Sequence, residues 1–181
     1  MLSLLPLIVT LCGVLQVQSR NMANPGDNNQ WRKVDILVSN TGPNDVSLDT
    51  SKIQYVMHEH TLSLNTPVWY CQIHDTTWQY NVQGTNLAIP ALSQPNDTTV
   101  TLTWTFNRGL KIPVNGKMEI QFGISRTDYS VIDQTQDPSY VASTTYIDNP
   151  VVPLQPGPAP RYAARTTPGI YGTVVPCCVR R

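Results

Sequence analysis

A ten-residue stretch, 73–82, combines aromatic rings with planar polar groups. It contains His74, Asp75, Trp78 and Tyr80. Aromatic faces pack against the C–H faces of pyranose rings, while imidazole and carboxylate groups can hydrogen-bond sugar hydroxyls at the rim. If the stretch is one strand, residues 74, 76, 78 and 80 share a face that is too rich in large polar aromatics for an ordinary core. We therefore predict a sugar-binding surface here. The alternative is that Trp78 lies in the core and Tyr80 at its rim.

Catalytic chemistry has little support in the sequence. His58 and His60 would share one strand face and could hold a transition metal, but solvated surface residues are the simpler interpretation. The G-x-S-x-G, phosphate-loop and H-E-x-x-H motifs are absent. Glu59 and Glu119 are the only glutamates, so a glycosidase would have to draw its carboxylate pair chiefly from aspartates. We therefore predict a binding protein and not an enzyme.

The elements that would position these groups read as β-strands. Residues 98–106 and 118–124 alternate apolar with polar side chains, and Asn115-Gly116 between them is a strong tight-turn signal. No helical stripe longer than two turns is present. Short alternating segments at this spacing predict an all-β, antiparallel two-sheet sandwich. We expect it to span residues 20–149, with Trp69 and Trp104 in its core.

The two ends of the chain differ in composition from the middle. Residues 2–17 are almost wholly apolar, and Val17 and Ser19 provide the small residues that signal peptidase needs. We predict a signal peptide over 1–19, cleaved between Ser19 and Arg20. No later segment approaches the roughly 20 apolar residues of a membrane span. The sequence therefore predicts a secreted protein of the extracellular matrix without a membrane partner.

From Pro150 onward the composition changes again. Seven prolines fall between Pro150 and Pro176, and residues 151–181 contain four arginines and no acidic residue. Because proline lacks a backbone donor, this composition predicts an extended or disordered basic tail over 150–181. The formal net charge of the whole chain is zero at pH 7, which argues against a nucleic-acid partner.

Loss of the signal peptide would leave three cysteines, Cys71, Cys177 and Cys178. An odd number requires one thiol to stay free or to pair between molecules. Cys71 falls in an expected strand and is interpreted as a small buried hydrophobe. Adjacent cysteines rarely bridge each other. We therefore predict disulfide-linked self-association, or a link to a matrix partner, through Cys177 and Cys178, with one bond back to Cys71 as the alternative.

Three segments, in order, resemble the family 3 carbohydrate-binding modules. VSNTG with LDTSKIQYV resembles the opening strands, VWYCQIHD the aromatic-Trp-Cys strand, and GLKIPVNGKMEIQFGISRTDYSVIDQTQDPSY the closing segment. The resemblance covers residues 34–141. It implies a nine-stranded jelly-roll sandwich that binds an insoluble polysaccharide, cellulose- or chitin-like, on one flat face.

The resemblance also implies a linear strip of aromatic and polar residues on that face. The family's strip arginine falls on Gly123 here, so Arg126 in the adjacent loop is its candidate replacement. Tyr129 stands where the family usually has Trp, which reduces the stacking area. The resulting carbohydrate-binding residues are His74, Asp75, Trp78, Tyr80, Arg126 and Tyr129.

A structural calcium ion is a further implication of the resemblance. Asn96, Asp97 and Thr98 match one group of the family's oxygen ligands, a donor set suited to calcium. Gln72 replaces the family's aspartate after Cys71, so a charge is missing and the site is expected to be degraded. Asn96 also begins the chain's only N-x-[ST] glycosylation sequon. The two predictions compete, because a glycosylated Asn96 would be a poor ligand.

The leading hypothesis is a stand-alone, secreted, non-catalytic protein that adheres to an insoluble polysaccharide. The alternative is a structural protein of a wall, shell or skeletal matrix on the same fold, cross-linked through its tail and without sugar binding. A copper-dependent polysaccharide oxygenase is disfavoured, because it needs an N-terminal histidine and cleavage after Ser19 would expose Arg20.

Overall fold

The computed structural model describes residues 15–22 and 29–157. Most of the predicted signal peptide, and Cys177 and Cys178 of the tail, therefore lie outside the described residues. Among the residues described, no helix is long and apolar enough to cross a membrane.

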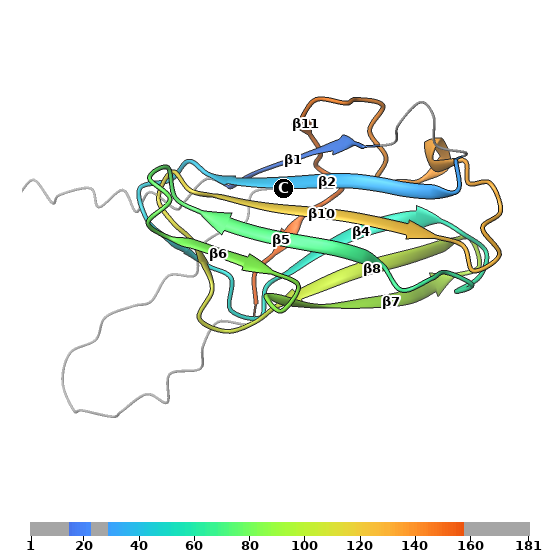
Figure 1. Ribbon diagram of the computed structural model, residues 1–181, viewed down its shortest axis with the longest axis horizontal. Helices are drawn as coiled ribbons and strands as arrows, with labels where there is room; N and C mark the ends of the chain where they lie inside the picture. The colour runs from blue at the N-terminus through green and yellow to red at the C-terminus, as the bar shows by residue number, and fades with distance from the viewer. Residues whose placement is uncertain (1–14, 23–28, 158–181) are drawn as a thin grey trace, which may run out of the picture.

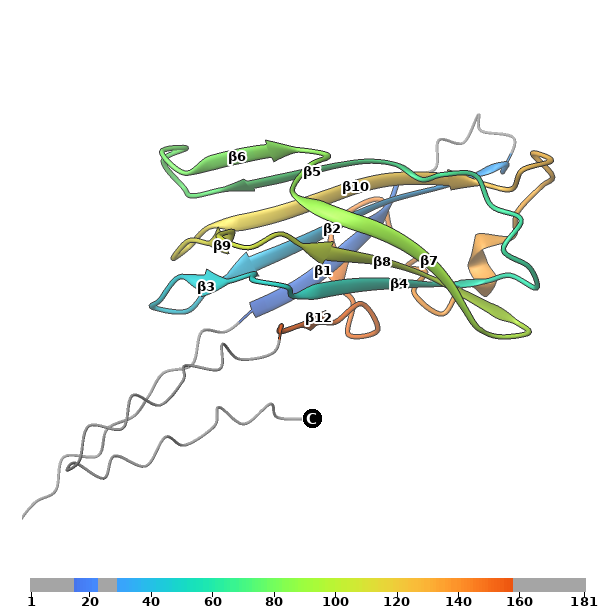
Figure 2. The same ribbon diagram turned by 90° about the horizontal axis from the view of Figure 1, so that it is seen from below.

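Two antiparallel sheets pack face to face as a sandwich (Figures 1 and 2). The six-stranded sheet has the order β11 (Ile147–Asp148), β1 (Leu15–Asn21), β2 (Trp31–Asn40), β10 (Lys117–Ser125), β5 (Val68–His74), β6 (Asn81–Gly84). The four-stranded sheet has the order β12 (Leu154–Gln155), β4 (Lys52–His58), β8 (Thr99–Phe106), β7 (Ala88–Asn96). A small ribbon pairs β3 (Val46–Ser47) with β9 (Lys111–Ile112), and the 3-10 helix η1 covers Gln134–Gln136. The all-β sandwich prediction is confirmed.

Alternating side chains of β8 and β10 form the centre of the core. Their buried members are Val100, Leu102, Trp104, Phe106, Met118, Ile120, Phe122 and Ile124, as the alternation predicted. Trp104 is fully buried, and its ring lies 4.9 Å from that of Phe122 and 6.4 Å from that of Trp69. Trp69 is only half-buried but packs against this core.

Cys71 lies on the inward side of β5 and is fully buried. Burial raises the pKa of its thiol to about 12. It is a free cysteine, as the small-hydrophobe interpretation requires. The alternative bond from Cys71 to Cys177 or Cys178 involves residues outside those described and remains a prediction.

The sandwich extends beyond both predicted boundaries. Strand β1 pairs with β2 along its whole length, from Leu15 opposite Asn40 to Asn21 opposite Val34. At the other end, Val152 is fully buried, and Leu154–Gln155 pair with β4. The boundaries at 20 and 149 are therefore too narrow. The apolar composition of residues 2–17 continues into β1, and the two-residue strand β12 lies between prolines, so composition alone did not mark either boundary.

The predicted cleavage between Ser19 and Arg20 falls inside β1. Ser19 is buried, and its Oγ accepts a hydrogen bond of 2.7 Å from Nδ2 of Asn149. The backbone N of Asn149 also donates to the carbonyl of Val17 at 3.0 Å. Cleavage after Ser19 would remove these contacts and expose an edge of β2. The intact sandwich therefore requires the chain to begin no later than the start of β1.

A buried guanidinium connects β2 to the loop after β10. Arg32 is fully buried; its Nε donates to Oδ2 of Asp137 at 2.7 Å, and its Nη2 lies 2.8 Å from Oε1 of Glu59. Asp137 ends η1 and also accepts a hydrogen bond from the backbone N of His58 at 2.9 Å. Glu59 is shared with Nε of Arg126 at 3.1 Å. This network fixes residues 126–137 to both sheets.

Replacing Arg32 with Met should lower the free energy of unfolding by about 3–5 kcal/mol, because Asp137 would keep a buried charge without its partner. Urea denaturation followed by tryptophan fluorescence measures this change. The matched control is Lys111→Met, which breaks an exposed ion pair with Asp45 and should cost less than about 1 kcal/mol. Equal losses in the two variants would contradict the role given to Arg32.

Candidate binding face

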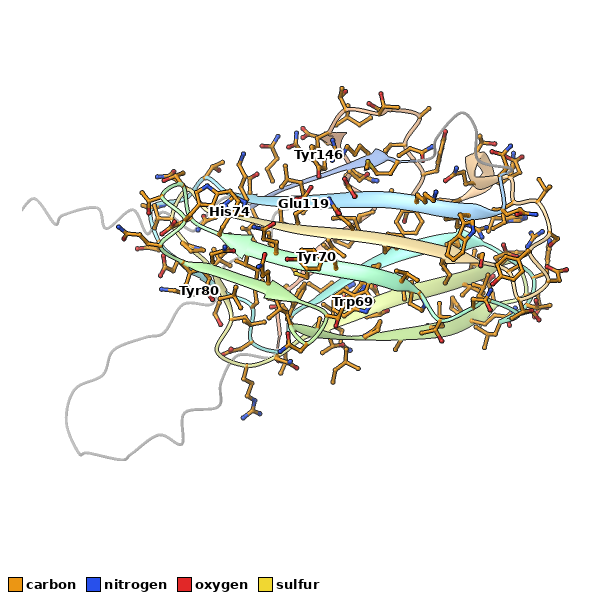
Figure 3. All side chains as sticks on the ribbon, viewed as in Figure 1. Trp69, Tyr70, His74, Tyr80, Glu119 and Tyr146 are labelled. Carbon is orange, nitrogen blue, oxygen red and sulfur yellow. The ribbon has the colours of Figure 1, made fainter. Side chains whose placement is uncertain are left out.

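The outward face of the six-stranded sheet is made of side chains that alternate with the core. On β5, Tyr70, Gln72 and His74 face outward, whereas Cys71 and Ile73 are buried. Figure 3 shows Tyr70 and His74 on this face, along with Glu119 of β10. The register places three cross-strand pairs in successive rows: Tyr70 with Gln121, Gln72 with Glu119, and His74 with Lys117.

One end of the face carries a stacked ring pair. The ring of Trp78 lies on that of His74 with centroids 4.1 Å apart and planes 7° from parallel. Trp78 is 56% exposed, so it is not a core residue. Strand β5 ends at His74 and β6 begins at Asn81, so residues 75–80 form a turn. The predicted single strand with His74, Trp78 and Tyr80 on one face is therefore wrong.

Asp75 organises this turn from within. Its Oδ1 accepts hydrogen bonds from the backbone N of Thr77 at 3.0 Å and of Gln79 at 2.9 Å, and its Oδ2 accepts one from that of Tyr80 at 3.2 Å. Desolvation opposes ionisation, but these hydrogen bonds prevail and lower the pKa of Asp75. The carboxylate that was predicted to bind sugar thus holds the loop that presents Trp78.

Tyr80 is half-buried and packs against the core. Nζ of Lys111 lies 5.6 Å from the centre of its ring. Figure 3 shows Tyr80 near β6, at the edge of the sheet. Tyr80 therefore lies at the edge of the sandwich against the core, and its contact with sugar remains a prediction.

A second ring pair lies at the opposite end of β10. Tyr129 is 50% exposed, and its ring lies 6.4 Å from that of Trp31, tilted by 51°. Trp31 begins β2 opposite Ser125, and its ring packs beside Gly123: a Cβ built at Gly123 would lie 3.4 Å from Cε3 of Trp31. An indole thus lies next to the place expected for an arginine. Trp31 was not among the predicted binding residues, although a glycine inside an alternating strand signals that another group approaches closely.

Arg126 anchors the loop that carries Tyr129. Its Nε lies 3.1 Å from both carboxylate oxygens of Glu59, and its Nη1 donates to the carbonyl of Val131 at 2.8 Å. These bonds bind the guanidinium to its own loop and to the network around Arg32. The predicted contact between Arg126 and a sugar remains a prediction.

Trp78 and Tyr129 share an unusual backbone conformation. Their φ angles are +60° and +54°, a region that bulky side chains rarely adopt and that costs about 1–2 kcal/mol per residue. Each closes a turn: N of Trp78 lies 3.4 Å from O of Asp75, and N of Tyr129 lies 3.1 Å from O of Arg126. Positive φ at two exposed, bulky residues makes this face the candidate functional surface.

Tyr70 lies between the two ring pairs. Tyr70 and His74 are four positions apart along β5. Gln121, the partner of Tyr70, and Ser125, the partner of Trp31, are four positions apart along β10. At about 3.3 Å per residue, each interval is about 13 Å. The stacked pair, Tyr70 and the Trp31–Tyr129 pair therefore form a line of rings about 26 Å long. We call this the ring line.

The predicted calcium ligands lie in the hairpin turn between β7 and β8. Oδ1 of Asn96 accepts hydrogen bonds from N of Thr98 at 2.9 Å and from Oγ1 of Thr98 and Thr99 at 3.0 and 2.9 Å. In the part of the chain that the structure describes, no three His, Cys, Asp or Glu residues form a group that could hold a metal. The Asn96 oxygen is thus used within its own turn, and calcium binding by Asn96, Asp97 and Thr98 remains a prediction. Asn96 is exposed, as a glycan acceptor must be, and its glycosylation remains a prediction.

Replacing Trp78 or Tyr129 with Asn, which tolerates positive φ, should change the free energy of unfolding by no more than about 1 kcal/mol, since relieved strain offsets the lost ring contact. Chemical denaturation measures both variants. The reference is Trp104→Ala, which should cost about 3–5 kcal/mol because it empties the core. A loss of that size for Trp78→Asn or Tyr129→Asn would make these rings structural.

Comparison with known proteins gives a family match over most of the chain. Residues 16–157 match the family model of the cellulose binding domain. No curated protein matches. Among solved structures, the chain is similar to a family IIIa CBD from Clostridium cellulolyticum, with 22% identity, a TM-score of 0.64, and coverage of 80% of this chain and 92% of that one.

Two structures from Clostridium thermocellum are similar as well. The family 3a carbohydrate binding module from the cipA scaffolding has 18% identity and a TM-score of 0.59, covering 75% of this chain and 91% of that one. Module CBM3b from the cellulosomal cellobiohydrolase 9A has 26% identity and a TM-score of 0.54, covering 75% of this chain and 86% of that one. These matches confirm the predicted family and its jelly-roll sandwich.

Proposed function

The chain belongs to the cellulose binding domain family, a family of non-catalytic binding modules, and from this membership we propose that it adheres to an insoluble polysaccharide through the ring line. The observation that carries this proposal is the exposure of Trp78 and Tyr129 in strained turns at the two ends of one sheet face. Neither ring contributes to the core, so the cost of holding it there calls for a ligand.

The rings of the line are held in place before any ligand arrives. The ring of Trp78 is stacked on His74, Trp31 rests on Gly123, and the hydroxyl of Tyr70 donates to Oε1 of Gln83 at 2.5 Å. Rigid rings lose little conformational freedom on binding, which favours affinity. The length of the line, about 26 Å, suits an extended ligand that presents several sugar faces in one plane.

Polar side chains between the rings complete a surface for sugar. Gln72 and Gln121 are planar amides that both donate and accept, which matches the double character of a hydroxyl. Lys117 lies on the same outward face of β10. Ring faces can therefore pack on C–H groups while these side chains bond the hydroxyls at the ring edges.

Two carboxylates on this face are engaged within the protein. Oδ2 of Asp35 accepts hydrogen bonds from Nε and Nη2 of Arg20 at 2.8 and 2.6 Å. Oε1 of Glu119 accepts the hydroxyl of Tyr146, whose ring lies 4.5 Å from Cζ of Arg20. Figure 3 shows Tyr146 beside Glu119. Carboxylates tied in this way stabilise the sheet, and the arrangement favours binding over glycoside hydrolysis.

Replacing both Trp78 and Tyr129 with Ala should reduce retention on insoluble polysaccharide at least tenfold, because stacking at both ends of the ring line is lost. A pull-down against microcrystalline cellulose, chitin and xylan measures the bound fraction and identifies the preferred solid. The matched control replaces Ile89 and Val151, which are exposed and outside the ring line, with Ala. Retention of the wild type on none of the three solids would refute the proposal and favour a structural matrix role on the same fold.

We propose further that the protein is secreted, with its leader removed before β1. The apolar segment at the start of the sequence supports export, and the pairing of Leu15 with Asn40 supports a cut upstream of Leu15. The expected result, by mass spectrometry of protein recovered from the medium of a eukaryotic secretion host, is an N-terminus at or before Leu15. An N-terminus at Arg20 would contradict this proposal, because the mature six-stranded sheet would then lack residues 15–19 of β1.

A further inference from the structure

Beside Trp31 the face of the six-stranded sheet is hollowed. The hollow is open and has a volume of about 600 Å³. Its apolar walls come from Met22, Trp31, Val68 and Tyr70, and Gly123 lies among the residues that line it. Since glycine has no side chain, the hollow reaches the backbone of β10 at this point. The rest of the ring line has side chains at every outward position of β10.

Three polar residues line the same hollow: Lys33, Asp35 and Gln121. The ammonium of Lys33 and the carboxylate of Asp35 have opposite charges, so their formal charges cancel. Asp35 is also held by Arg20. Gln121 adds an amide that both donates and accepts. A lining of aromatic walls with a few polar groups and no net charge from Lys33 and Asp35 suits a neutral sugar better than a uronic acid.

The shape of the hollow favours a single polysaccharide chain in solution over the same polysaccharide in a crystalline solid. Its volume lies within the range of small-molecule sites, about 300–1,000 Å³. Chains at the surface of a crystalline solid are fixed beside one another in a plane and cannot descend into a recess. A single chain in solution is free to place one or more rings between Trp31 and Tyr70.

We propose that this hollow binds a segment of a single, neutral, soluble oligosaccharide chain, with Trp31 and Tyr70 as its ring-stacking walls. The inference rests on the proposed function, because it places the hollow within the ring line. It assigns a second mode of binding to the same face: the ring line contacts a flat solid, and the hollow takes one free chain. Gly123 distinguishes the two modes, because a side chain at this position would fill the hollow.

Gly123→Gln is the variant that tests this assignment. The three atoms nearest to a Cβ at this position are Cε3 and Cζ3 of Trp31, at 3.4 and 3.8 Å, and the carbonyl oxygen of Arg32 at 3.8 Å, all at ordinary van der Waals distances. The backbone can therefore accept a side chain, and a glutamine would extend into the hollow. Ala91→Gln is the matched control, since Ala91 is an exposed small residue on β7 of the other sheet.

Isothermal titration calorimetry with cellohexaose should detect binding to the full chain. Gly123→Gln should weaken that binding at least tenfold, while Ala91→Gln leaves it unchanged. A hexameric oligogalacturonate should bind more weakly than cellohexaose, because the lining offers no net positive charge. The indole N–H resonance of Trp31, assigned with Trp31→Phe, should shift with cellohexaose. Thermal unfolding of each variant shows that it is folded.

Equal affinity of the wild type and Gly123→Gln for cellohexaose would overturn the hollow as the site, as would absence of binding to the wild type. Equal or stronger binding of oligogalacturonate would overturn the neutral ligand. Retention on insoluble cellulose separates this failure from that of the proposed function. If the wild type is retained on the solid but does not bind cellohexaose, the proposed function of the ring line is supported and the proposed role of the hollow is refuted. If the wild type is not retained on cellulose, chitin or xylan, the proposed adhesion through the ring line is refuted as well.

Discussion

A guanidinium enclosed between two sheets destabilises a protein unless the charges around it are matched, and Arg32 meets that condition through Asp137 and Glu59. Asp137 fixes the segment after β10, and Glu59 in turn holds Arg126, whose loop carries Tyr129. Because strand residues alternate, the inward position of Arg32 also fixes its neighbour Trp31 on the outward face. One end of the ring line therefore depends on an interaction made on the opposite side of the sheet.

The two ends of the ring line are built on the same plan. A charged side chain binds the backbone of its own loop, Asp75 at one end and Arg126 at the other, and each loop turns through a left-handed residue that exposes a ring. Asp75 and Arg126, which were predicted to bind sugar, are hydrogen-bonded within the loops that carry Trp78 and Tyr129 and support the positions of these rings. A direct contact of either charged group with sugar remains a prediction.

Local alternation was sufficient to predict the inward faces of β8 and β10, because apolar burial repeats every second residue wherever one side of a strand meets the core. It failed for residues 75–80, where hydrogen bonds from the backbone to Asp75 favour a turn over an extended strand. The exposure of Trp78 could be anticipated from its chemistry, but the contact between Trp31 and Gly123 could not. That contact joins positions 92 residues apart through the register of β2 and β10, which no local pattern contains.

Cys71 shows how the sandwich holds together without covalent help. Its thiol is enclosed in β5 and stays protonated at physiological pH, because burial raises its pKa to about 12. Thiolate is the form that attacks disulfides and reacts with oxidants, so Cys71 is inert to both. The described residues contain no second cysteine, so no disulfide bond between them contributes to the stability of the sandwich. The same fold should be reached in a reducing cytoplasm and in an oxidising secretory compartment.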